Sequence, residues 1–243
     1  MHFLAAAPMM DSPNGQPGWI KWGFVLSWLP NLKAGPGGLA GTTYTVALIL
    51  FQPPVEMLDR LLTVVQSRAW TDTTVDPYVL VDIALVSWYH RVDQVAWQVT
   101  DLIRAEEQEI FDRTRMLRST TNMESTIVDF DLHRIHTNAK NAIFMIEALD
   151  GALRLVDAAL SDHETQGGKG NIVWQNTQRR LRHRREMFHS SRLRTVSCQA
   201  RIKNTVDLVC TQTPQCFRRR RPLTHRAGFP YQHCARQPRK SRK

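Results

Sequence analysis

Acidic side chains cluster in two nearby stretches of the sequence. Glu106, Glu109 and Asp112 lie at helical spacing in one stretch, and Asp129 begins the next. If two antiparallel helices bring these carboxylates together, they could bind a hard cation such as Mg²⁺, which takes carboxylate and water oxygens as ligands. The alternative is a solvated acidic face near the tip of a helix hairpin. The sequence requires no cofactor, and Mg²⁺ is the one cation that it suggests.

Basic side chains are concentrated at the other end of the chain. Residues 1–165 carry 12 Lys and Arg against 20 Asp and Glu, whereas residues 166–243 carry 20 against 2, for a net charge of +10. Such clusters neutralise nucleic-acid phosphates or an anionic membrane surface, so one candidate function is that of a nucleic-acid-binding or nuclear protein acting through this basic C-terminal region. The alternative is a charged, solvated tail without a dedicated ligand. The residues concerned are Arg179, Arg180, Arg182, Arg184, Arg185, Arg218, Arg219, Arg220 and Arg221.

Enzymatic motifs are missing from the sequence. It contains no G-x-S-x-G or G-x-G-x-x-G pattern and no Cys and His at the spacing of a nucleophilic pair, so we expect a non-enzymatic protein without a small-molecule substrate. The four cysteines all follow residue 197, which suits a reducing, intracellular compartment. Because the strongest apolar run, 46–51, is far too short for a membrane helix, we predict a cytoplasmic protein. It would reach a membrane only if the gene product continued into transmembrane helices.

Three long helices account for residues 76–209. Asp76 and Pro77 are typical of a helix start, and we expect this helix to reach about Leu117. A second helix should run from Thr126, with Asp129 completing a capping box, to about Leu160. Both carry apolar residues at alternating steps of three and four, which predicts an antiparallel hairpin. The two seams are Val81, Leu85, Trp88, Val92, Val95, Val99 and Leu102, and Val128, Leu132, Ile135, Ala139, Ala142, Ile146, Leu149, Leu153, Val156 and Leu160.

Gly151 lies inside the second predicted helix, where a glycine lowers helix stability. Close approach of another helix at this point would explain why a glycine is present. The third helix should run from Ile172 to about Val209, with basic side chains along the acidic body. Self-association through the long helices would give a homo-oligomer.

The N-terminal quarter is predicted to be a small sheet followed by a short helix. Residues 1–18 are interpreted as an irregular lead-in, and the runs 22–29 and 42–51 as antiparallel strands covered by helices. A short helix should begin near Pro54 and reach about Arg68, which ends this part at residue 75. Residues 210–243 contain four prolines and no acidic residue, and are expected to be a disordered basic tail. The fold class is therefore α+β, mostly α.

Several stretches resemble fungal CorA-like divalent-metal (Mg²⁺) transporter proteins. The resemblance covers roughly residues 20–209. It is carried by Trp22–Pro30 (WGFVLSWLP), Trp88–Glu106 (WYHRVDQVAWQVTDLIRAE), the heptad helix 128–160 and Arg184–Val206, including SSRLRTVSCQARIKNTV. It implies a cytoplasmic domain that ends in a stalk helix.

The chain departs from that family after Val209. In the family, the stalk helix leads into a membrane helix that ends in a Gly-Met-Asn motif at the ion entrance. This sequence has neither an apolar span there nor that motif, so the ion-selecting residues of the family have no counterpart in it. We therefore expect a remnant of the cytoplasmic domain, from a truncated or misread gene, that does not transport ions by itself.

Overall fold

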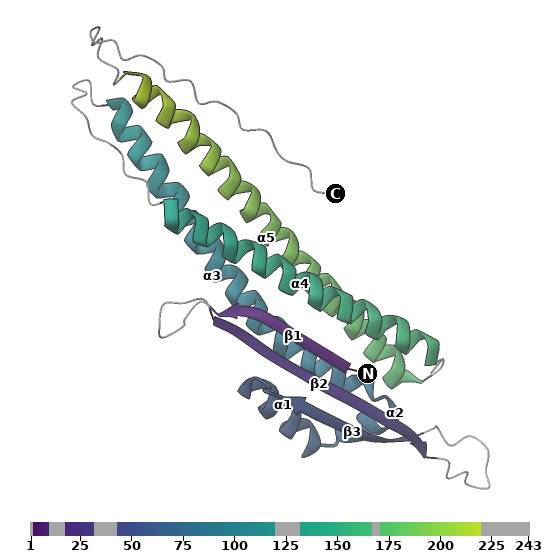
Figure 1. Ribbon diagram of the computed structural model, residues 1–243. Helices are drawn as coiled ribbons and strands as arrows, with labels where there is room; N and C mark the ends of the chain where they lie inside the picture. Colours follow the sequence, from purple (N-terminus) through teal and green to yellow (C-terminus); the bar gives the residue numbers. More distant parts are fainter. Residues whose placement is uncertain (1, 10–17, 32–42, 120–131, 167–170, 220–243) are drawn as a thin grey trace, which may run out of the picture. The chain divides into compact units, whose positions relative to one another are not determined.

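A computed structural model describes residues 2–9, 18–31, 43–119, 132–166 and 171–219 (Figure 1). The chain divides into two units, Met1–Val206 and Asp207–Lys243. The contacts described below all lie within the first unit. This unit combines a small antiparallel sheet with long helices, so the predicted α+β, mostly α class is confirmed.

The sheet has three antiparallel strands in the order β1-β2-β3. The predicted strand pair is confirmed as β2 (Gly18–Asn31) and β3 (Thr43–Phe51), with Phe24 opposite Leu50. Residues 10–17 lie outside the described residues, but the prediction of an irregular lead-in over 1–18 is wrong for His2–Met9, which forms β1 and pairs with β2. This short run shows no clear apolar alternation, and a neighbouring strand supplies its backbone hydrogen bonds. β1 also lies beside helix α4.

One face of the sheet packs against the helices. Trp22, Phe24 and Leu26 point to this face and are buried, and the Trp22 ring lies 5.6 Å from that of Trp88. We expected helices to cover the sheet, but Ile49 and Phe51 on the other face are more than half exposed in the described structure. The sheet therefore carries apolar side chains on both faces, and those on the outer face are exposed.

Two short helices link the sheet to the long ones. The predicted short helix is α1 (Val55–Val65), which packs on α3. A further helix, α2 (Trp70–Val75), follows it and was not predicted. Gln52, between β3 and α1, has a positive φ of 50°, which turns the chain before Pro53 and Pro54.

The long helices form the predicted antiparallel hairpin and a third arm. α3 (Tyr78–Ser119) and α4 (Leu132–Gln166) run antiparallel, since the end of α4 contacts the start of α3 and Arg134 contacts Glu106. The predicted capping box at Thr126 and Asp129 lies outside the described residues. α5 (Ile172–Arg219) is antiparallel to α4 and parallel to α3 (Figure 1). α5 continues past Val209, where the third helix was predicted to end. The prediction of a disordered tail is therefore wrong for residues 210–219, which are helical, and residues 220–243 lie outside the described residues.

The apolar seams hold in part. On α3 the predicted residues are buried up to Val99, but Leu102 is exposed and Ile103 is buried instead. A straight helix has 3.6 residues per turn, so a strict heptad drifts around it and the buried position moves on by one residue.

On α4 the seam differs from the predicted one in the opposite direction and by the same amount along the helix. Ile135, Ala142, Leu149 and Val156 are buried as predicted. At the intermediate positions of the seam the buried side chains are Met145, Ala152 and Ala159. Each lies one residue before the predicted seam residue, which is Ile146, Leu153 and Leu160 in turn. The buried face of α4 is therefore rotated slightly from the face that the sequence pattern indicated.

Gly151 offers a test of the α4 packing. The predicted close approach of another helix is wrong, because a Cβ atom added at Gly151 would meet nothing within 4 Å. We expect Gly151→Ala to raise the free energy of unfolding by up to about 1 kcal/mol, since Ala loses less backbone freedom than Gly in a helix. Urea denaturation measures this change, with Ala158→Gly at an exposed position of α4 as the reverse control. A loss of stability in Gly151→Ala would contradict the open packing.

Candidate functional site

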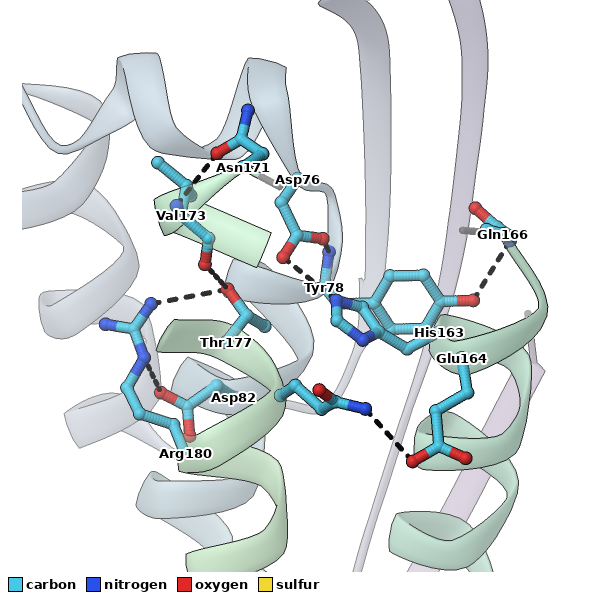
Figure 2. Close-up of polar contacts among 11 residues, drawn as sticks. Asp76, Tyr78, Asp82, His163, Glu164, Gln166, Asn171, Val173, Thr177 and Arg180 are labelled. Carbon is cyan, nitrogen blue, oxygen red and sulfur yellow. Dashed lines mark hydrogen bonds and ion pairs between the residues drawn. The ribbon is translucent and has the colours of Figure 1, made fainter. Parts of the chain in front are cut away.

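A buried polar junction lies where α3 begins, α4 ends and α5 begins. Asp76 and His163 are both 0% exposed, and His163 Nε2 lies 3.2 Å from Asp76 Oδ2 (Figure 2). The other carboxylate oxygen, Oδ1, accepts the Tyr78 backbone N–H at 3.0 Å, which confirms Asp76 as the N-cap of α3. Because an ionised carboxylate only accepts hydrogen bonds, Nε2 carries the proton of His163 in this contact. Asp76 thus caps one helix and holds a side chain of another.

Aromatic rings enclose His163. The Trp174 ring stacks on the imidazole with centroids 3.8 Å apart and planes 14° apart, and the Tyr78 ring meets it edge-on at 5.1 Å. His163 Nδ1 is buried without a hydrogen-bond partner among the described residues. A His oriented by a carboxylate can act as a general base, but only when a substrate can reach it. Here Trp174 and Tyr78 cover the ring, so the pair serves to join three helices.

The Tyr78 hydroxyl extends this junction toward the end of α4. It donates a hydrogen bond to Asp162 and accepts one from Gln166 at 3.2 Å. Burial raises the pKa of Tyr78 far above its ordinary value, and the hydrogen bond to the Asp162 carboxylate raises it further. The phenol therefore stays protonated and remains a donor to α4.

From this junction a row of polar contacts, called the polar lane, runs along the interface of α3 with α5. In its first contact Arg184 binds Asp82 at 2.8 Å. Arg180 also lies 3.4 Å from Asp82 (Figure 2). Further along, Ser191 donates to Asp93 at 2.7 Å, and the Cys198 thiol donates to Thr100 at 3.5 Å. The lane ends at the bidentate pair of Arg201 with Glu107.

Burial strengthens the first contact of this lane. The side chains of Asp82 and Arg184 are only 8% and 15% exposed. Removing one partner of such a pair leaves an uncompensated charge in the interior, which costs far more than breaking an exposed ion pair. The polar lane therefore strongly favours one register of α5 on α3.

A second row of ion pairs joins α4 to α5 at the surface. Arg182 binds Glu164 at 3.0 Å, Arg185 binds Asp157 at 2.7 Å, and Arg192 binds Asp150. The three carboxylates are seven residues apart, so they lie along one line of α4. The hydrogen bond from Arg182 lowers the pKa of Glu164 below its ordinary value, so Glu164 is ionised at neutral pH. These exposed pairs add orientation and little stability.

The predicted carboxylate cluster meets a cation from the protein itself. Glu106 and Glu109 both bind Arg134 of α4, with one Arg134–Glu106 contact at 3.1 Å. The hydrogen bond from Arg134 is the main cause of a lowered pKa at Glu109. Asp112 accepts a hydrogen bond from Gln108 at 3.0 Å, and Asp129 lies outside the described residues. Within the described ranges, no group of three or more His, Cys, Asp or Glu is placed to hold a metal ion.

The predicted basic cluster is largely occupied by carboxylates. Of the five arginines between residues 179 and 185, all but Arg179 contact an acidic side chain of α3 or α4. The expected alignment of basic side chains with the acidic body is confirmed for these four. Arg218 and Arg219 lie in the last turn of α5, where only the helix itself is described, and Arg220 and Arg221 lie outside the described residues. Binding of a polyanion at 179–185 would have to compete with these internal pairs.

Sequence reasoning missed His163 and the polar lane, although both carry a signal. His163 continues the seven-residue series of Ala142, Leu149 and Val156. On α5, the series Thr177, Arg184, Ser191 and Cys198 repeats at the same interval. A search restricted to apolar residues stops before His163 in the first series and overlooks the second, in which Thr177, Arg184 and Ser191 are polar.

Comparison of the chain with models of protein families, with curated proteins and with solved structures found no match. Among the helices that the structure describes, none has both the length and the apolar composition needed to cross a lipid bilayer.

The junction predicts unequal effects for two helix caps. Asp76→Ala should lower the free energy of unfolding by about 2–4 kcal/mol, because α3 loses its N-cap and the buried His163 Nε2 loses its partner. Asn171 caps α5 through the Val173 N–H at 2.8 Å and is exposed, so Asn171→Ala should cost only about 1 kcal/mol. Urea denaturation measures both variants. Equal losses would mean that the contact with His163 adds nothing.

Proposed function

We propose that this chain is a non-enzymatic domain of the CorA-like divalent-metal transporter type, acting on the cytoplasmic side of a membrane without transporting ions by itself. The proposal rests on the sequence resemblance and on the order of elements, in which a small sheet precedes a long helix hairpin and a further long helix. The resemblance predicts the same order.

The observation that carries the proposal is the course of α5. Two rows of arginine–carboxylate pairs attach α5 to both helices of the hairpin within the first unit. A helix that is fixed in register on a folded body can transmit a change in that body along its axis. The resemblance implies that the third long helix is a stalk, and a helix held in this way would suit that role.

The proposal includes self-association through the long helices. Large apolar side chains are exposed on α3 at Trp97 and Phe111 and on α5 at Leu193. Contact between copies would remove these side chains from water, which is the usual driving force for helix association.

A divalent cation would act on the late turns of α3. Glu106, Glu109 and Asp112 supply the oxygens that Mg²⁺ prefers. In the described structure these carboxylates are not placed to hold a metal ion together, and Arg134 binds the two glutamates. Mg²⁺ would have to displace the guanidinium and draw the carboxylates together, so we expect weak binding. Binding would then loosen the contact between the tip of α3 and the start of α4, and so couple the cation to the hairpin.

Calorimetric titration of the full chain with Mg²⁺ tests this proposal, together with thermal unfolding at the same Mg²⁺ concentrations. Mg²⁺ at ten times its dissociation constant should stabilise the native protein by about 1.4 kcal/mol. Replacing Glu109 by Gln and Asp112 by Asn should abolish the effect. Asp157→Asn, which removes an exposed carboxylate of α4, should preserve it. Absence of heat together with unchanged unfolding would refute cation sensing.

A further inference from the structure

Helix α1 has two apolar faces, and the described structure covers one of them. Met57 and Leu61 are buried where α1 packs on α3. The second face consists of Val55, Leu58, Leu62 and Val65, which are 69%, 38%, 55% and 52% exposed and are called the α1 stripe below. These residues follow steps of three, four and three, which aligns them along one side of the helix.

The α1 stripe is symmetric in both spacing and residue type. Read from either end it is Val, two residues, Leu, three residues, Leu, two residues, Val. When two such helices lie antiparallel about a twofold axis level with Arg60, Val55 faces Val65 of the second copy and Leu58 faces Leu62 of the second copy. Twofold interfaces require a surface that is complementary to itself. The α1 stripe meets this requirement with four matched apolar layers.

The size of the stripe fits a modest interface. Its four side chains expose on the order of 350 Å² of surface per copy, so their contact would bury about 700 Å² in the pair. This area lies below the range for stable, specific interfaces and fits a weak, transient one. A weak, concentration-dependent dimer is the expected product.

We propose that the α1 stripe binds a second copy of this chain in an antiparallel, twofold arrangement. This goes beyond the proposed function, which assigns self-association to the long helices and a cation response to the tip of α3. The α1 stripe lies on neither, so its test needs no Mg²⁺ and its outcome is independent of the cation test.

Sedimentation equilibrium of the full chain across the micromolar range tests the dimer. The native protein should show a concentration-dependent mass between one and two chains. Leu62→Glu should raise the dissociation constant at least about tenfold, because it buries two unpaired carboxylates per dimer. Leu29→Glu changes an exposed leucine, 69%, on β2, outside both the α1 stripe and the long helices, and should leave the dimer intact. A native protein that stays monomeric, or equal effects of the two variants, would overturn the proposal.

Mixing experiments test the antiparallel register. Leu58→Lys and Leu62→Glu chains should form a mixed dimer more readily than either chain associates with itself, because the introduced lysine would face the introduced glutamate while the other leucine layer stays apolar. Leu58→Lys and Leu58→Glu chains should show no such preference, since their charges would lie in different layers. Thermal unfolding followed by circular dichroism verifies that every variant is folded. Equal preference in both mixtures would contradict the twofold pairing.

Discussion

The structure of the first unit depends on the buried ion pair between Asp82 and Arg184. α5 meets α3 through polar side chains at Arg184, Ser191 and Cys198 in addition to the ring contact of Phe188 with Tyr89. α3 and α4 share a mainly apolar seam, with polar contacts toward its two ends. Apolar contacts tolerate small shifts, but a buried charge that loses its partner is strongly destabilising. A polar residue inside a helix seam is therefore a good device for specifying register, at a cost in stability.

The uneven distribution of charge along the sequence follows from this arrangement. The arginines of α5 neutralise carboxylates on both helices of the hairpin, from Glu164 at one end to Glu107 at the other. The buried junction of Asp76, His163 and Trp174 joins the three helices where α5 begins. Together these contacts determine the direction and the register of α5, so the basic segment 179–185 has a structural role inside the molecule.

The sequence predicts much of this fold because heptad patterns report directly on helix packing. The hairpin, the cap at Asp76 and the strands β2 and β3 were all predicted. β1 was missed because its pairing depends on a neighbouring strand, and the seam shift at Ile103 arises from the true helical repeat. On α4 the buried residues keep the heptad repeat, but Met145 is buried in place of the predicted Ile146. The sequence predicted that Glu106 and Glu109 lie together near the start of the next helix. It did not reveal that Arg134 of that helix binds both carboxylates, which leaves them paired with a side chain of the protein.

A double-mutant cycle on Asp82 and Arg184 tests the central claim most directly. Alanine substitutions, singly and together, measured by urea denaturation, give the coupling free energy of the pair, and a second cycle on the exposed pair Asp157 and Arg185 provides the reference. We predict a coupling of about 1.5–3 kcal/mol for the buried pair and less than about 1 kcal/mol for the exposed pair. Equal and small couplings would contradict the claim that the polar lane sets the register of α5.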